Sequence, residues 1–269
     1  MLKLAYKVSN IAIKAGEITL KFYGKSEFKL KDDASPLTQA DLESNAFITK
    51  ELEKISEYLV CSEEAVLEYE KRKNLEYFWL IDPLDGTKDF LAQNHGFTIN
   101  IALIHKNRPI LGVVYAPALK ELYFGALDSG AYALKNIKDN IDESYIEANK
   151  IKLNKSPRKL ESNLIACDSI FHSTQETQEF IKQHNLTIKK AGSSLKFCVL
   201  ASNEADLYPR FAGSSEWDIA AGDIILKESG GIIIDLDTKK EIIYNKESLR
   251  NANFIAFKNI ELKDRFINI

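Results

Sequence analysis

The stretch WLIDPLDGTKDF, residues Trp79–Phe90, places two aspartates three positions apart directly after a hydrophobic segment. Aromatic and branched residues favour a strand up to Asp82, and Pro83 cannot donate a ladder hydrogen bond, so we expect the strand to end there. Side chains three positions apart point to opposite faces of a regular strand. Asp82 and Asp85 therefore converge only if the chain turns between them, and Gly86 supports such a turn.

The expected turn is a candidate magnesium site. Two carboxylates with the Leu84 carbonyl between them form a hard, oxygen-rich donor set of the kind that Mg²⁺ prefers. Thr87 adds a hydroxyl beside this set. The alternative interpretation is a polar hairpin turn, because turns also collect Asp, Pro and Gly.

Two further segments bring acidic residues that each have a simpler interpretation. Glu63 and Glu64 in VCSEEAV precede the strand, where the alternative is a solvated acidic loop. Thr38 and Asp41 in SPLTQADLESN have the spacing of a helix start, where Asp41 would serve as a first-turn acid. Each segment alone is weak support for a functional site.

A fourth acidic position is Asp218 in EWDIAAGDIILKESGG, which we expect to be the N-cap of a helix over Asp218–Ser229. A helix start also favours an anion such as phosphate, and the small residues after Asp218 would let a ligand approach closely. The four histidines form no close metal-ligand pair. Four acidic segments in a chain with few histidines predict that carboxylates bind several Mg²⁺ ions, and phosphoryl transfer is the natural use of such a site.

The composition indicates an ordinary globular protein. The chain has 269 residues, 45% hydrophobic and 28% charged residues and a net charge of -3, so no basic excess points to a long nucleic-acid partner. Lysines interrupt the N-terminus, which we interpret as an amphipathic helix instead of a signal peptide, and no apolar run is long enough to span a bilayer. We expect a cytoplasmic protein without disulfides, which leaves open loose association with the inner face of a membrane.

The order of the predicted elements differs between the two halves. Helices followed by a run of strands predict an antiparallel α+β layer in residues 1–148. A polar, lysine-rich stretch over residues 136–159 marks a boundary. Strands and helices then alternate, which predicts a more parallel α/β domain over residues 149–269.

Three motifs together, SEE, WLIDPLDGTKDF and EWDIAAGDIILKESGG, resemble the signature of the lithium-sensitive, Mg²⁺-dependent inositol monophosphatase superfamily. KDDASPLTQAD, the Lys-Asp-Phe ending of DGTKDF and GSSLKFCVLASNEADLYPRF are similar to its CysQ-like 3'(2'),5'-bisphosphate nucleotidase branch. The resemblance implies a layered α-β-α-β-α sandwich with two or three Mg²⁺ ions. The implied reaction, linked to sulfur assimilation, hydrolyses adenosine 3',5'-bisphosphate to AMP and phosphate.

The resemblance also assigns expected roles to individual residues. The implied metal ligands are Glu63, Asp82, Asp85, Asp218 and the Leu84 carbonyl. Asp41 and Thr87, together with Glu63, would activate water. The implied substrate site comprises Gly86, Thr87, Lys88, Ser193, Ser194, Lys196, Arg210 and Asp218. Lys196 and Arg210 would bind a second phosphate, although surface salt bridges are the alternative, and Tyr208 could stack on adenine or pack in the core.

Other functions remain open at this point. A haloacid-dehalogenase-type phosphatase uses D-x-D-G-T, whereas this chain has D-x-x-D-G-T. An inositol-monophosphatase-like sugar phosphatase would share the metal site. A catalytically silent nucleotide- or metal-binding protein would need no water-activating pair. In each enzymatic case the partner is a small phosphate ester, and we expect a monomer or homodimer.

Overall fold

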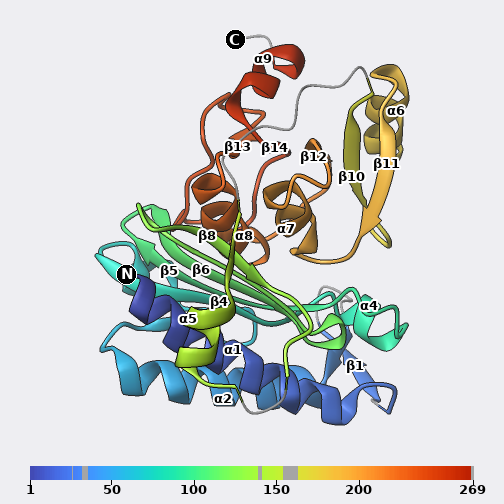
Figure 1. Ribbon diagram of the computed structural model, residues 1–269. Helices are drawn as coiled ribbons and strands as arrows, with labels where there is room; N and C mark the ends of the chain where they lie inside the picture. The colour runs from blue at the N-terminus through green and yellow to red at the C-terminus, as the bar shows by residue number, and fades with distance from the viewer. Residues whose placement is uncertain (26, 32–35, 139–140, 154–162, 268–269) are drawn as a thin grey trace.

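The protein forms five alternating layers of helices and sheets (Figure 1). The structure, a computed structural model, describes residues 1–25, 27–31, 36–138, 141–153 and 163–267. Within these residues a seven-stranded and a five-stranded sheet lie above one another, with helices outside and between them. This arrangement confirms the α-β-α-β-α sandwich that the resemblance implied.

The first layer consists of two long helices, α1 (Leu2–Phe22) and α2 (Gln39–Ile55). Apolar side chains at helical spacing along α1 pack together with those of α2 and of the seven-stranded sheet. The N-terminal amphipathic helix predicted from the sequence is therefore confirmed. In the sequence, β1 (Phe28–Leu30) and β2 (Pro36–Thr38) lie between the two helices, and they pair as a two-stranded antiparallel sheet.

The seven-stranded sheet is antiparallel except at one edge, where β3 and β4 run parallel. The predicted antiparallel first half is thus confirmed. In sheet order its strands are β3 (Val60–Ser62), β4 (Tyr77–Asp85), β5 (Thr98–His105), β6 (Arg108–Ala116), β7 (Glu121–Ala126), β8 (Gly130–Leu134) and β9 (Ile151–Lys152). The connections carry α3 (Tyr69–Arg72), α4 (Thr87–Leu91), the 3-10 turn η1 (Pro117–Leu119) and α5 (Glu143–Asn149).

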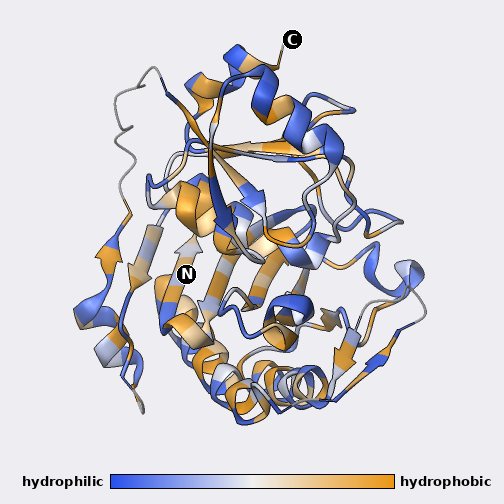
Figure 2. Ribbon diagram, turned by 90° about the vertical axis from the view of Figure 1, so that its right-hand side faces the viewer, coloured by the Kyte–Doolittle hydropathy of each residue, from blue (hydrophilic) through white to orange (hydrophobic). Residues whose placement is uncertain are grey.

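Two helices fill the space between the sheets: α7 (Leu195–Ala201) and α8 (Glu216–Glu228). Figure 2 shows hydrophobic residues concentrated on the central strands and on the helix above them. The small residues near the start of α8 take part in this packing, and the close approach of a ligand to them stays a prediction. A Cβ atom at Gly222 would lie 2.5 Å from the ring of Phe197, and one at Gly112 would meet the α8 backbone at Ala221.

The second sheet is mixed, and not simply more parallel. Its order is β11 (Thr187–Ala191), β10 (Ile165–Ser169), β12 (Leu207–Arg210), β14 (Phe254–Phe257) and β13 (Ile232–Asp235). The first three strands are parallel and the last two pair antiparallel. The outer layer contains α6 (Gln175–Gln183), α9 (Lys263–Phe266) and the 3-10 turn η2 (Ile260–Leu262), which pack on this sheet through a separate apolar cluster.

The division into residues 1–148 and 149–269 stays a prediction. Strand β9 follows the predicted boundary, yet it pairs with β8 of the first sheet. Helix α8 belongs to the second part and contacts β4, β5, β6 and β7 of the first. Parts of the predicted linker (139–140 and 154–159) and residues 32–35 of KDDASPLTQAD lie outside the described residues.

The close contact between Gly222 and Phe197 gives a stability prediction. An alanine in a helix interior is normally better than glycine by about 1 kcal/mol. We expect Gly222→Ala instead to lower the free energy of unfolding by about 1–3 kcal/mol, the usual cost of overpacking, because the added methyl overlaps the ring. Chemical denaturation measures this change. The double variant Gly222→Ala/Phe197→Leu should be less destabilised than the sum of the single variants, and strict additivity would contradict the steric explanation.

Candidate active site

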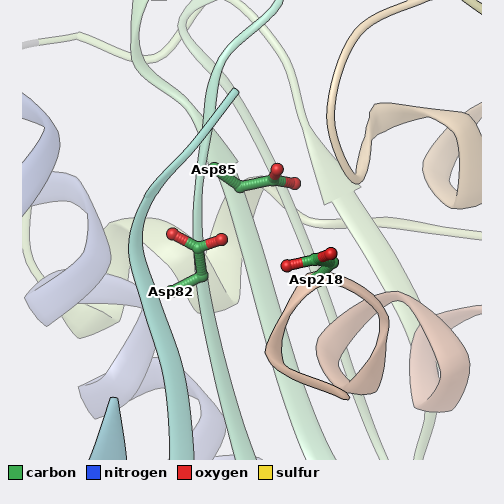
Figure 3. Close-up of side chains that lie close together, drawn as sticks. All are labelled: Asp82, Asp85 and Asp218. Carbon is green, nitrogen blue, oxygen red and sulfur yellow. The ribbon is translucent and has the colours of Figure 1, made fainter. Parts of the chain in front are cut away.

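Three aspartates from two distant parts of the chain meet between the sheets (Figure 3). Asp82 and Asp85 belong to β4, and Asp218 lies in the first turn of α8. One carboxylate oxygen from each lies within 4.8 Å of the others. The predicted convergence of these three side chains is therefore present.

The chain brings the two strand aspartates together through a bulge and not through a strand end. Pairing of β4 with β5 continues past Pro83 to Asp85, with a register shift between Asp82 and Asp85. Our prediction that the strand ends at Pro83 is thus wrong, because the missing N–H of proline is absorbed by the bulge. The Ser44 hydroxyl of α2 donates to the Pro83 carbonyl at 2.7 Å and anchors this bulge.

Helix α8 begins differently from the sequence prediction. Ser215, and not Asp218, is the N-cap, and Asp218 is the third residue of the helix, where it completes a capping box with Ser215. The Ser215 N–H donates to Asp218 Oδ2 at 2.7 Å. Capping and the candidate ligand role therefore coexist, since the second carboxylate oxygen of Asp218 is not needed for the cap.

Burial and mutual repulsion make the three aspartates an electrostatically costly group. Burial, followed by the negative charges of Glu63 and Asp85, raises the pKa of Asp82 well above its ordinary value. Burial, followed by Asp85 and Glu63, raises the pKa of Asp218 to about 8. A divalent cation would relieve this repulsion, and the all-oxygen donor set fits Mg²⁺. The residues present therefore fit the predicted metal.

Glu63 lies beside the three aspartates and is paired with a lysine. Its N–H donates to the Ile81 carbonyl at 3.2 Å, which holds it next to β4. Lys31 Nζ contacts one carboxylate oxygen of Glu63 and one of Glu64, each at 2.7 Å. Burial raises the pKa of Glu63, while Lys31 opposes this shift. A metal-ligand role for Glu63 and for the Leu84 carbonyl stays a prediction.

The predicted water-activating pair is also close together. Thr87 Oγ1 lies 3.4 Å from Asp41 Oδ1, within reach of a long hydrogen bond. The other oxygen, Asp41 Oδ2, accepts from the N–H and hydroxyl of Thr38 at 2.8 and 2.6 Å. The helix-capping and functional interpretations of Asp41 therefore use different oxygens. Burial raises the pKa of this carboxyl group.

A pocket opens next to the aspartates, and most of the predicted substrate residues border it. Its lining includes Gly86, Ser193, Lys196, Arg210 and Tyr208. Gly86 has a φ of 86° and a Cβ atom there would overlap the Ser193 hydroxyl, so glycine is required. Tyr208 packs against Phe197 and Phe254, and its ring also faces the pocket.

Two cationic side chains, Lys196 and Arg210, also line this pocket. Lys196 is buried, donates to the Ser193 carbonyl at 2.7 Å, and has its pKa lowered to about 8 by burial. Arg210 contacts two backbone carbonyls, those of His172 and Gly213, each at 3.3 Å. Within the described residues neither cation forms an ion pair with a carboxylate. The surface-salt-bridge alternative therefore does not describe them.

Three predicted substrate residues are not part of the pocket lining: Thr87, described above, Lys88 and Ser194. Lys88 is exposed on α4, although its charge still acts on His172. Ser194 is buried and its N–H and hydroxyl face Asp85. Their substrate roles stay predictions.

Four residues near the site were missed by sequence reasoning: Lys31, Asp89, Asn100 and His172. Asp89 is buried, borders the pocket and accepts from Asn94 Nδ2 at 2.7 Å. Burial and the positive charges of Arg210, Lys88 and Lys196 lower the pKa of His172 to about 4, so its ring is neutral near pH 7. The Lys-Asp-Phe ending of DGTKDF was a signal for Asp89, whereas His172 has no local pattern.

Comparison with known proteins agrees with this geometry. The sequence model of the Inositol monophosphatase family matches residues 2–267. The chain is 34% identical to the 3'(2'),5'-bisphosphate nucleotidase CysQ of Salmonella typhimurium over 255 residues, which cover 92% of this chain and 97% of that protein.

Solved structures give the same assignment. The crystal structure of CysQ from Bacteroides thetaiotaomicron, a bacterial member of the inositol monophosphatase family, has a TM-score of 0.83 and 36% identity over 94% of this chain and 96% of that one. An IMPase/NADP phosphatase complexed with Mg²⁺ and phosphate shares the fold, with a TM-score of 0.75 and 18% identity over 95% of this chain and 91% of that one. The carboxylate cluster, the layered fold and these matches show that the chain belongs to the inositol monophosphatase family.

Proposed function

We propose that this protein is a Mg²⁺-dependent phosphatase that hydrolyses the 3'-phosphate of adenosine 3',5'-bisphosphate to give AMP and phosphate. The main support is one observation: two aspartates of the cluster, Asp85 and Asp218, line the same pocket as Lys196 and Arg210, which form no ion pair with a carboxylate within the described residues. A bisphosphate presents one phosphate to the metal site at the aspartates and a second phosphate to the cations. The names of the similar nucleotidases agree with this choice of substrate.

Asp82, Asp85 and Asp218 would hold Mg²⁺, with Glu63 and the Leu84 carbonyl as proposed further ligands for two or three ions. When bound, Mg²⁺ offsets the negative charge of the phosphate and makes water more acidic. The chain itself positions the ester. Because α4 begins right after Gly86, its first backbone N–H groups have no partner within the helix and can donate to phosphate oxygens.

Thr87 and Asp41 provide a route for the proton of the attacking water. The Thr87 hydroxyl accepts this proton and passes its own to Asp41 Oδ1. The raised pKa of Asp41 makes its carboxylate a better proton acceptor. The distance of 3.4 Å is compatible with this role, because such contacts often shorten only when substrate is bound.

Lys196 and Arg210 in the pocket lining determine which phosphate ester is preferred. Arg210 can bind a phosphate with two N–H groups, because a guanidinium presents its donors as a planar fork. The Lys196 ammonium lies 5.2 Å from the Tyr208 ring centroid, so this pair presents a cation beside an aromatic face. A cytoplasmic location and a monomeric or homodimeric state remain predictions.

The first test is a substrate panel assayed by phosphate release with Mg²⁺, with and without Li⁺. We expect adenosine 3',5'-bisphosphate to react faster than 3'-AMP, inositol monophosphate or fructose bisphosphate, and Li⁺ to inhibit. Arg210→Gln should raise KM for the bisphosphate about tenfold or more, since a hydrogen bond to a charged group is lost, but leave 3'-AMP nearly unchanged. Lys189→Gln, which alters a partly exposed ion pair, is the control. Equal effects of Arg210→Gln on both nucleotides would contradict the assignment.

The second prediction concerns proton transfer. Thr87→Ala should lower kcat by about 10²–10⁴-fold, the usual contribution of a positioned acid-base group, while the unfolding temperature changes little. The hydroxyl of Thr38 contacts the other oxygen of Asp41. The variant Thr38→Ser keeps this hydroxyl, so it should retain most activity. Steady-state kinetics at saturating Mg²⁺ measure both. A Thr87→Ala enzyme with more than a tenth of normal kcat would rule out this route.

The third prediction is a pH dependence of stability without metal. The folded pKa of Asp218 is about 8, far above an unfolded value of about 3.9. The folded state therefore holds this proton more tightly, and the corresponding stability is complete below about pH 4 and lost as the pH rises through 8. In EDTA, the unfolding temperature should fall between pH 6 and pH 9. Saturating Mg²⁺ or Asp218→Asn should reduce that fall, and an identical slope in all three samples would contradict the explanation.

A further inference from the structure

Asp85 is held by side chains and backbone that come from outside its own segment. Its Oδ2 atom accepts hydrogen bonds from the Ser194 N–H at 2.9 Å and from Asn100 Nδ2 at 3.1 Å, and the Ser194 hydroxyl oxygen lies 3.1 Å away. Asn100 and Ser194 are both 1% exposed. Two N–H donors converge on one carboxylate oxygen in a place that water hardly reaches.

The other two aspartates each have one carboxylate oxygen that accepts a hydrogen bond from a backbone N–H two or three residues away. Asp82 Oδ1 accepts from the Leu84 N–H at 3.0 Å, and Asp218 Oδ2 accepts from the Ser215 N–H at 2.7 Å. In the described part of the chain, no hydrogen bond reaches the second oxygen of either residue, nor Oδ1 of Asp85. Each aspartate therefore has one oxygen fixed by the protein and one left for a ligand.

We propose that Asn100 and Ser194 are positioning residues for the metal: they reserve Oδ2 of Asp85, so that this aspartate binds a divalent cation through Oδ1 alone. The proposal rests on the proposed function, since it concerns the same metal site. A carboxylate oxygen has two lone-pair sites, and the two N–H donors occupy both, so none is left for a cation. Partners that orient a ligand in this way typically control metal affinity.

The orientation of the Asn100 amide is itself fixed. Thr98 Oγ1 donates to Asn100 Oδ1 at 2.9 Å, which marks Oδ1 as the acceptor end. Nδ2 must then face Asp85 and the Ser194 hydroxyl, which it reaches at 2.9 Å. The asparagine is thus a rigid link between β5 and the start of α7.

Ser194 also connects the two metal-bearing segments to each other. Its hydroxyl contacts the backbone carbonyl of Asp218 in addition to the Asp85 carboxylate. Asp85 lies in the first sheet and Asp218 in the helix above it, and the repulsion between their carboxylates would push these segments apart. Ser194 bridges them from the α7 side, so we expect it to help set the spacing of the two ligands.

The test is calorimetric titration of the full chain with Mn²⁺ and with Mg²⁺, in the absence of nucleotide. Ser194→Ala and Asn100→Ala should each raise the metal Kd by about 10–100-fold. Ser229→Ala is the matched control: it removes another buried hydroxyl bonded to a carbonyl, at the far end of α8. Its metal Kd should stay within twofold of the unchanged protein.

Kinetics separate positioning from substrate binding. Because neither residue contacts the nucleotide in this proposal, raising Mg²⁺ should restore most of kcat in both variants with KM for the bisphosphate nearly normal. A raised nucleotide KM with an unchanged metal Kd would overturn the proposal and favour a substrate role for Ser194. Metal Kd values within twofold of normal, with only a lower unfolding temperature, would also overturn it.

The outcome is independent of substrate identity. If the protein binds Mn²⁺ and the variants weaken that binding, the positioning role stands even if adenosine 3',5'-bisphosphate is not hydrolysed. Conversely, hydrolysis of that nucleotide with metal Kd values unaffected by both substitutions would leave the proposed function intact and remove the positioning role.

Discussion

The repulsion among three closely spaced carboxylates is the constraint on which the rest of the structure depends. Asp82, Asp85 and Asp218 gain nothing from one another in the absence of a cation, and burial raises the cost of ionising Asp82 and Asp218. The surrounding chain must therefore hold them by other means. A bulge anchored by α2 fixes the first pair, and the packing of α8 between two sheets fixes the third.

The fold supplies this rigidity because α8 lies in the middle layer. Its approach to the first sheet depends on Gly112, where any side chain would meet the helix backbone, and its contact with α7 depends on Gly222. Gly222 lies one turn along α8 from Asp218, and Gly112 meets the same helix at Ala221, so both positions set how deep the first turn of α8 sits. Repulsion from the other carboxylates would displace a metal-ligating residue on a loop. A metal-ligating residue on a helix packed between two sheets is held in place.

The sequence predicted what is encoded locally and missed what depends on tertiary contacts. The helices, the antiparallel run of strands and the cluster of aspartates follow from periodicity, turn chemistry and a recognisable motif. The end of β4 was mispredicted because proline usually stops a ladder, and only the pairing partner β5 shows that pairing resumes at Asp85. Asn100 reads as one polar residue in an apolar strand, and no local pattern reveals that its amide faces a carboxylate 15 positions away.

Gly86 and Ser193 lie beside a pocket in which opposite charges coexist. These two residues touch where the first sheet meets the start of α7, and the pocket is lined by Asp85 and Asp218 as well as by Lys196 and Arg210. A monophosphate bound through a cation at the aspartates leaves the Arg210 guanidinium facing backbone carbonyls. A ligand with two phosphates engages the aspartate-bound cation and this guanidinium at once. Selectivity for a bisphosphate would then arise because its second phosphate supplies the counter-charge that Arg210 lacks among the described residues, the same requirement that draws a metal to the aspartates.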